Sequence, residues 1–251
     1  MSNATAPCLA VRHDARVSTY PAAAHTADIV ALRVSAKERL EVLLWERADE
    51  PFRGQLALPG GYLATGESLE HSAMRHLSEK VAMQTVAHLE QLETRSEPDR
   101  DPRGWTVSTA FLALTGPDSA KPEPPGDTAW YDAGSPPTLA FDHRDLLALA
   151  VERLRGKLSY TNIAFGLVPR TFAIADLRVA YRAVLGYDVD PANLLRVLVR
   201  GELIVPTGQR RPAGPRGGRP AELYRFTRRE LTVSRPLAAF RPRVRRSAPP
   251  D

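Results

Sequence analysis

The first 160 residues alternate short apolar runs of strand length with two longer stretches of helical periodicity. Apolar runs on both sides of the polar turn SAKER predict a β-hairpin, and apolar residues recur at helical spacing from Ser68 to about Val81. Strands alternating with helices indicate one α/β domain. The predicted strands are 27–34, 40–46, 87–94 and 105–115. The predicted helices are 68–81 and 141–158, and Asp142 is expected to cap the second. Residues 51–62 are expected to form a loop that leads into a short strand, and residues 116–137 a surface loop.

After Tyr160 the pattern changes to helices followed by a hairpin. A helix is predicted to end at Gly186, and after a four-residue turn Asp190 and Pro191 are expected to begin the next one. Leu195, Leu198 and Val199 are expected to lie on its inner face. The predicted segments are 163–168, the helices 174–185 and 190–200, and the strands 203–206 and 222–226 around the basic loop 207–221. Helix, tight turn, helix and a hairpin with a basic tip predict a winged helix-turn-helix.

These patterns divide the chain into four expected parts. They are a flexible leader at 1–24, an α/β domain at 25–158, a winged helix-turn-helix domain at 159–230 and a basic disordered tail at 231–251. No run of about 18 apolar residues is present, so neither a membrane span nor secretion is expected. The single cysteine, Cys8, excludes an intrachain disulfide and fits a cytoplasmic location.

Charge separates the two halves of the chain. Residues 1–150 carry 14 Lys and Arg against 21 Asp and Glu, whereas residues 151–251 carry 20 against 8. A GC-rich genome would explain the preference for arginine over lysine, but not why carboxylates become scarce in one half only. A separate basic half indicates a polyanionic partner, because neutralising phosphates releases condensed counterions.

Residues 60–83 follow the spacing of the Nudix box, a pattern that in active enzymes places three carboxylates around a metal ion. Gly61, Glu67, Arg75, Leu77 and Glu79 match it, while His76 and Lys80 replace glutamates and Ala82 replaces a glycine. Positions 76, 79 and 80 are predicted to share one helix face.

Mg²⁺ requires oxygen ligands, and an ammonium about 4 Å away would oppose its binding by roughly 8 kcal/mol at an effective dielectric of about 20. No metal site, no cofactor and no catalytic residue is therefore predicted.

Several of these residues have a second interpretation. Glu67, Arg75 and Glu79 can form a surface ion network without binding anything, and His76 is expected to be solvent-facing or hydrogen-bonded. Lys80 is alternatively a direct phosphate contact. In the charged loop 97–105, the planar guanidinium groups of Arg100 and Arg103 suit phosphate oxygens. Trp105 can stack on a base, but packing in the core is the favoured interpretation.

Taken together, the chain resembles the Nudix-related transcriptional regulators of NAD metabolism (NrtR) over about residues 25–230. The matching segments are PFRGQLALPGGYL, QLET…PDRDPRG, LAFDHRDLL, LRGKLSYTNIAFGLVP and FAIADLRVAYRAVLG…GRPAELYRF. The resemblance implies a Nudix-type α/β/α sandwich with a mixed sheet, followed by a winged helix-turn-helix. It also implies a homodimeric repressor that binds palindromic operator DNA at NAD-metabolism genes and is released by ADP-ribose or a related NAD derivative.

Carried over by position, the resemblance implies a set of ligand-binding residues. They are Arg53, Gly61, Glu67, Arg75, Glu79, Arg100 and Arg103. Where the family is expected to have Gly-Asp-Pro in the charged loop, this chain has Ser96, Glu97 and Pro98. The extra carboxylate would retune recognition of an anionic effector, so the identity of the effector stays open.

The basic half supplies the predicted DNA contacts. Asn193, Arg196 and Arg200 recur along the 190–200 helix, and such side chains can bind adenine and guanine edges in the major groove. The further predicted contacts, to phosphates or the minor groove, are Lys157, Arg210, Arg211, Arg216 and Arg219. A solvated basic face is the alternative for any one of them. DNA is favoured over RNA because no stacking aromatics interleave the basic residues.

Three functions therefore remain open from the sequence. The leading one is a ligand-responsive repressor that works as a homodimer on double-stranded operator DNA, in the cytoplasm and associated with the nucleoid. The second is a Nudix hydrolase that cleaves ADP-ribose or another nucleoside diphosphate derivative. The third is a regulator whose sensor domain has lost its ligand and serves only for dimerisation.

Overall fold

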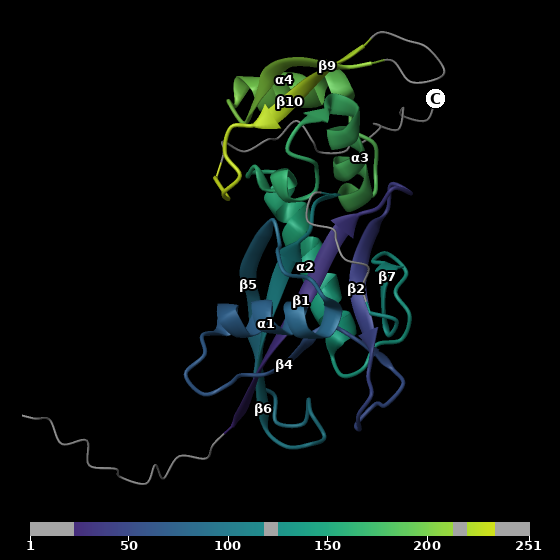
Figure 1. Ribbon diagram of the computed structural model, residues 1–251, viewed down its shortest axis with the longest axis vertical. Helices are drawn as coiled ribbons and strands as arrows, with labels where there is room; N and C mark the ends of the chain where they lie inside the picture. The colour runs from purple at the N-terminus through teal and green to yellow at the C-terminus, as the bar shows by residue number, and fades with distance from the viewer. Residues whose placement is uncertain (1–22, 118–124, 213–219, 234–251) are drawn as a thin grey trace, which may run out of the picture.

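The computed structural model describes residues 23–117, 125–212 and 220–233, which form a large sheet domain with a smaller helical domain above it (Figure 1). The larger domain holds β1 (Ala24–Val34), β2 (Leu40–Glu46), β3 (Leu56–Ala57), β4 (Gly60–Tyr62), α1 (Leu69–Val81), β5 (His88–Arg95), β6 (Thr106–Leu114), β7 (Thr128–Asp132) and α2 (His143–Leu158). The smaller one holds the 3₁₀ turn η2 (Ile163–Gly166), β8 (Phe172–Ala173), α3 (Ile174–Leu185), α4 (Pro191–Arg200), β9 (Ile204–Arg211) and β10 (Ala221–Phe226).

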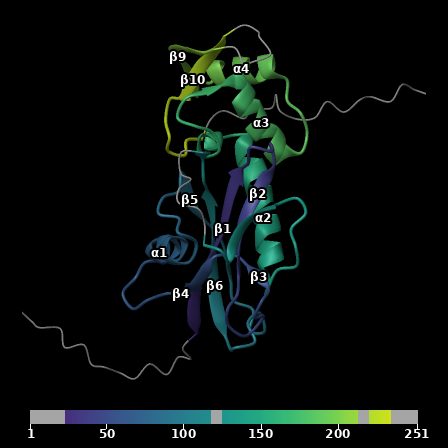
Figure 2. The ribbon, with the colours of Figure 1, turned by 45° about the vertical axis from the view of Figure 1, so that its right-hand side comes forward.

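The large sheet is mixed and has a helix on each face. Strand β1 pairs in parallel with β6 and antiparallel with β2, which confirms the predicted hairpin. Along β1, Ile29 and Ala31 pack with Leu77 of α1, whereas Val30 and Leu32 pack on the opposite side with α2. Figure 2 shows α1 and α2 on the two sides of the sheet. The predicted α/β/α sandwich with a mixed sheet is confirmed.

The box helix has the predicted start and a less usual end. The Ser68 hydroxyl accepts a hydrogen bond from the His71 backbone N–H and so satisfies one of the orphan donors of the first turn. Ala82, at the position where the box pattern has glycine, ends the helix with φ 55° and ψ 25°. This left-handed conformation costs an L-residue roughly 1–2 kcal/mol, which explains why glycine suits that position.

Two expectations about the larger domain are wrong. The predicted surface loop 116–137 contains β7, an edge strand that pairs with β2 through Trp130 and Leu43. Its β-branched and aromatic residues pack on β2, but the run is too short to stand out among the surrounding Pro and Gly residues. Asp142 precedes α2 but makes no side-chain capping bond, because its carboxylate binds Arg100 instead.

The smaller domain has the predicted winged-helix order, with three corrections. Strand β9 runs to Arg211, well beyond the predicted end, and β8 adds an unpredicted third strand beside β10. In α4 the Asp190 side chain caps the helix as predicted, accepting from the Asn193 N–H. The buried residues of α4 are Leu194 and Leu198, whereas Val199 is 42% exposed and so does not lie on the inner face.

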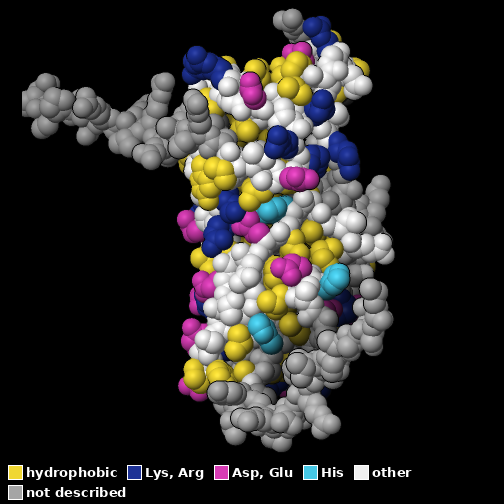
Figure 3. Space-filling view, turned by 90° about the vertical axis from the view of Figure 1, so that its left-hand side faces the viewer, with side chains coloured by type: hydrophobic (Ala, Val, Ile, Leu, Met, Phe, Trp, Pro, Cys, Tyr) yellow, Lys and Arg dark blue, Asp and Glu magenta, His cyan; other side chains and the backbone are white. Residues whose placement is uncertain are grey.

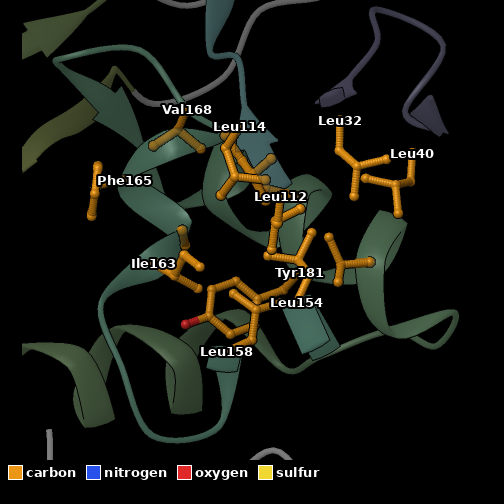
Figure 4. Packing of buried hydrophobic residues seen from close by; sticks show 14 of the residues in the cluster. Leu32, Leu40, Leu112, Leu114, Leu154, Leu158, Ile163, Phe165, Val168 and Tyr181 are labelled. Atoms are coloured by element: carbon orange, nitrogen blue, oxygen red, sulfur yellow. The ribbon is translucent and has the colours of Figure 1, made fainter. Parts of the chain in front are cut away.

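One hydrophobic core continues through both domains. Leu112 and Leu154 from the larger domain belong to the same buried cluster as Tyr181 of α3 and Leu198 of α4. Figure 4 shows Tyr181 beside Leu154, Leu158 and other apolar side chains of this cluster. Because the cluster spans the junction, the winged helix packs directly on the sheet domain and is not joined to it by a linker alone.

The chain also returns to the junction after β10. The Thr232 N–H donates to Asn162 Oδ1 at 2.7 Å, and the Asn162 amide donates to the carbonyls of Arg228 and Glu230. Residues 231–233, which were expected to begin a disordered tail, are thus held by hydrogen bonds. The predictions for residues 1–22 with Cys8, for 213–219 and for 234–251 lie outside the described residues. None of the helices in the described part of the chain could cross a membrane, since none is both long and apolar enough.

Candidate functional site

A cavity of about 390 Å³ opens beside the box helix, between the sheet and the start of α2. It includes three predicted ligand-binding residues, Gly61, Arg100 and Arg103, and both box substitutions, His76 and Lys80. The other lining residues are Thr26, Asp28, Trp45, Arg47, Asp49, Leu58, Gly60, Tyr62, Asp101, Phe141 and His143. A cavity of this size, with cations and aromatic rings in its wall, suits a small anionic ligand with a planar group.

Glu67, Arg75 and Glu79 form an ion network beside this cavity and do not line it. Arg75 donates to both carboxylate oxygens of Glu67, at 2.8 and 2.7 Å, and to Glu79 at 3.2 Å. The hydrogen bonds from Arg75 lower the pKa of Glu67 to about 2. Arg75 also donates to the Tyr62 carbonyl, so the network ties the loop before α1 to the helix. This arrangement matches the alternative interpretation of these three residues as an ion network.

His76 is buried against the glycine pair. A Cβ atom on Gly61 would lie 2.6 Å from the His76 ring, so that position needs glycine for the ring to pack there. His76 Nε2 lies 3.1 Å from the Tyr62 carbonyl oxygen, consistent with the predicted hydrogen-bonded role. Burial lowers the pKa of His76, and the neighbouring charges of Arg75 and Lys80 act in the same direction. The ring is therefore neutral at pH 7.

Lys80 reaches into the cavity from the last turn of α1. Its ammonium donates to the Gly60 carbonyl at 2.6 Å and lies 4.2 Å from the centroid of the Trp45 ring, a cation–π contact. Burial lowers the pKa of Lys80, although the nearby Asp28 carboxylate opposes the shift. Glu79 does not share this position, because its side chain is 60% exposed and directed to Arg75. The prediction that positions 76, 79 and 80 share one helix face is therefore wrong: His76 and Lys80 line the cavity, and Glu79 does not.

The residues at the box do not fit a divalent cation. In the described part of the chain no three His, Cys, Asp or Glu side chains gather closely enough to hold a metal ion. The two box side chains that line the cavity are an imidazole and an ammonium, and neither offers the oxygen ligands that Mg²⁺ requires. No step of hydrolysis through a metal can be built from these side chains.

Arg100 and Arg103 line the cavity, each bound to a carboxylate. Arg100 donates to Asp142 at 2.7 and 3.2 Å with a side chain only 6% exposed. Burial alone would raise the pKa of Asp142, but the hydrogen bonds and charge of Arg100 lower it. Arg103 binds Asp101 in the same bidentate way and lies over the rings of Tyr62 and Phe141. Both guanidinium groups are therefore already charge-compensated.

Arg47 is a cavity residue that sequence reasoning missed. It donates to the backbone carbonyls of Pro51 and Asp49 and lies 4.8 Å over the Phe141 ring. Its only sequence signal is its place after the second predicted strand, directly before the PFRG loop. Arg53, the residue predicted from that loop, is exposed and does not line the cavity.

Asp28, Ser108 and His143 form a buried polar cluster that was also missed. The Ser108 hydroxyl donates to Asp28 at 2.5 Å, and the Leu58 N–H donates to His143 Nδ1 at 2.9 Å. Burial lowers the pKa of His143, so the ring is neutral and carries its proton on Nε2, 3.9 Å from Asp28. This cluster gives the cavity the Asp28 carboxylate and one fixed N–H donor, in addition to the carboxylates of Asp49 and Asp101. Hydrophobic periodicity does not indicate Asp28 or His143 as site residues, because each lies at the end of an apolar segment.

Trp105 does not pack in the core as predicted. It is 45% exposed, and its indole N–H donates to the Ser96 carbonyl at 3.1 Å. It does not line the cavity either. Its place at the end of the charged loop, outside the sheet, leaves the ring on the surface.

The predicted DNA face lies on α4 and on the strands of the wing. Arg196 and Arg200 are exposed, and Arg196 donates to the Asn193 side-chain oxygen at 2.6 Å. Figure 3 shows Lys and Arg side chains gathered mainly over the upper part of the molecule, where the winged-helix elements lie. An α-helix that presents Asn and Arg side chains outward has the form that enters a major groove.

The remaining predicted DNA contacts differ in their surroundings. Arg210 is exposed and lies opposite Glu222 in the β9–β10 ladder. Arg211 forms an ion pair with Asp176, which also caps α3, so it ties the wing to that helix. Lys157 is bound to Glu90 at 2.7 Å and is mostly buried, a position that does not present it to DNA. Arg216 and Arg219 lie outside the described residues.

Comparison with known proteins identifies both domains. Residues 24–150 match the NUDIX domain, and residues 164–226 match the NrtR DNA-binding winged helix domain. The chain is 31% identical over 232 residues to the ADPR responsive transcriptional repressor NtrR of Acinetobacter baylyi, covering 90% of this chain and 91% of that protein. It is 35% identical over 109 residues to the ADP-ribose pyrophosphatase of Methanocaldococcus jannaschii, covering 43% of this chain and 63% of that protein.

The fold matches a solved structure of similar organisation. The crystal structure of Shewanella oneidensis NrtR complexed with a 27mer DNA aligns with a TM-score of 0.72 and 31% identity, covering 80% of this chain and 92% of that one. Sequence and structural similarity thus extend across the sheet domain and the winged helix together. The chain belongs to the NrtR family, in which a Nudix domain is followed by a DNA-binding winged helix domain.

Proposed function

We propose that this protein is a transcriptional repressor of NAD-metabolism genes that responds to ADP-ribose or a related NAD derivative. One observation carries the proposal: the box side chains that line the cavity are a neutral imidazole and an ammonium, while a basic winged helix shares the core of the same molecule. Such a cavity retains the means to bind a nucleotide without the ligands for metal-dependent cleavage. The similarity to the ADPR responsive repressor of Acinetobacter baylyi supports the choice of effector.

We assign residues 25–158 to a domain that senses the effector and residues 159–230 to a domain that binds DNA. A physical connection between them supports this assignment. Helix α2 begins beside the cavity, where Arg100 holds Asp142, and its far end contacts the winged helix. There Arg155 donates to the Val184 carbonyl of α3 at 2.9 Å. Sixteen residues of helix span about 24 Å, so a ligand that moves the start of α2 acts directly on α3.

We further propose that the protein acts in the cytoplasm as a homodimer on a palindromic double-stranded operator. Asn193, Arg196 and Arg200 would contact base edges, and Arg210 the phosphates beside them. An effector can release DNA only if it binds the DNA-free arrangement more tightly than the DNA-bound one. ADP-ribose is therefore expected to weaken operator binding.

The test is a mobility-shift titration with promoter DNA from NAD-biosynthesis genes, at two salt concentrations and with or without ADP-ribose. The expected result is a sequence-selective, salt-sensitive complex that ADP-ribose dissociates. Arg196→Ala should weaken it, whereas Arg144→Ala, an exposed arginine on α2 away from α4, should leave it unchanged. A protein that binds every promoter and an unrelated fragment alike would refute the proposal.

A hydrolase is the second candidate, favoured by the 35% identity of the sheet domain to an ADP-ribose pyrophosphatase. Mg²⁺-dependent release of AMP from ADP-ribose, lost in Glu79→Gln, would establish it. A sensor domain kept only for dimerisation would instead show no heat of binding with ADP-ribose, NAD or nicotinamide derivatives. Calorimetry on the full chain thus separates the third function from the other two, and the assay for AMP release separates the hydrolase from the repressor.

A further inference from the structure

The four cations in the cavity wall are not equivalent. Arg100 and Arg103 are each bound to a carboxylate, as described above. Lys80 and Arg47 have no Asp or Glu oxygen within 4 Å among the residues that the structure describes, although both line the cavity. Asp28, Asp49 and Asp101 also line the cavity, but none of them forms an ion pair with Lys80 or Arg47 in the part of the chain that the structure describes. Two partly buried cations without an ion-pair partner attract an anion, because desolvation makes each of them costly without a close counter-charge.

The hydrogen bonds of these two side chains leave donors for a ligand. An ammonium has three N–H groups, and Gly60 accepts one from Lys80. The Arg47 guanidinium has five, and the carbonyls of Pro51 and Asp49 each accept one. Burial lowers the pKa of both side chains, although the Asp28 carboxylate acts in the opposite direction on each, so a bound anion would further stabilise their charged forms.

Lys80 also occupies a particular place in the box. Its position is the one at which the box pattern has a metal-binding glutamate, and the described residues include no cluster of three His, Cys, Asp or Glu side chains that could hold a metal ion. The positive charge that a metal ion supplies in the enzymes is here supplied by a side chain that is part of the protein. A lysine is a compact point charge and an arginine a planar fork, and both recognise phosphate oxygens.

We propose that Lys80 and Arg47 bind the diphosphate of the effector directly, with no divalent cation. The inference rests on the proposed function for the identity of the effector, but it specifies how this chain recognises any nucleoside diphosphate derivative. Arg100 and Arg103, which sequence reasoning favoured for this role, are assigned to holding Asp142 and Asp101 instead. Their carboxylate partners would have to be displaced before a phosphate could bind in the same geometry.

The experiment is isothermal titration of the full chain with ADP-ribose in Mg²⁺ and in EDTA, with inorganic pyrophosphate as a second probe. We expect the same Kd in both buffers and competition by pyrophosphate. Lys80→Met should weaken binding by about 30-fold or more, because it removes a buried charge-assisted contact. Lys80→Arg should keep most of the affinity. Lys37→Met, at an exposed lysine outside the cavity, is the matched control and should have no effect.

Each outcome has a defined consequence. Binding that disappears in EDTA, or Lys80→Met binding as tightly as the unmodified chain, overturns the inference; melting curves of each variant exclude loss of folding as the cause. If ADP-ribose does not bind at all, the proposed effector is wrong. Pyrophosphate binding that still depends on Lys80 and not on Mg²⁺ would then support the diphosphate site by itself, and no pyrophosphate binding would refute both.

Discussion

The shared core predicts that the sensor and the winged helix unfold together. Leu154 lies on α2, is 0% exposed, and belongs to the buried cluster that includes Leu112 of the sheet and Tyr181 of α3. Leu154→Ala removes the part of the side chain that fills the space between the two domains. The change therefore tests whether the domains are energetically one unit or two.

The expected cost follows from the burial of the side chain. Truncating a fully buried leucine destabilises a protein by about 2–5 kcal/mol, since the transfer free energy is lost and a cavity remains. A central figure of about 3 kcal/mol corresponds to a fall in Tm of roughly 6–12 °C for a chain of this size. Val199→Ala is the control, because Val199 is 42% exposed and its truncation should change Tm by little.

Differential scanning calorimetry is the measurement. The unmodified chain should unfold in one transition, and Leu154→Ala should move that whole transition to lower temperature. Adding ADP-ribose at about 100 times its Kd should raise the free energy of unfolding by about 2.7 kcal/mol, again in one transition. Two separate transitions, with only the sheet domain affected by the variant or by the ligand, would refute the idea that the core couples the domains.

Three further predictions concern the site. The double variant His76→Glu with Lys80→Glu places acids where the box pattern has them, so it should bind Mg²⁺ and should cleave ADP-ribose. Metal titration measures the binding, and release of AMP measures the cleavage. Lys80→Met alone is the control and should show neither Mg²⁺ binding nor AMP release. Because the pKa of Glu67 is lowered to about 2, its ion pair with Arg75 stabilises the protein above about pH 4.3 and loses this effect as the pH falls toward 2. Glu67→Gln should therefore lower Tm at pH 7 and have a diminishing effect in acid; an equal effect at both pH values would contradict this reasoning. Arg196→Ala should reduce operator affinity by about 1–3 kcal/mol and relax the sequence preference, and a uniform loss on all DNA would instead indicate a phosphate contact.

The sequence by itself determined the helices, the hairpin and the order of the two domains. These features depend on short-range rules: Ser68 caps the helix that follows it, Asp190 does the same for α4, and apolar periodicity separates strand from helix. The box spacing also located one wall of the cavity, because Gly61, His76 and Lys80 lie close together in the chain, on the strand β4 and the helix α1 that follows it. Information within a few residues was sufficient for all of these.

Tertiary structure decided which charges are paired. Arg100 and Asp142 are 42 residues apart in the chain, and Lys157 and Glu90 are 67 apart. Their contacts depend on how the loop before β6 and the strand β5 lie against α2, which no local pattern encodes. For the same reason Arg47 lines the cavity and Arg53 does not. A side chain's type fixes its charge, but only the folded arrangement of distant segments decides whether that charge is already neutralised or remains available to a ligand.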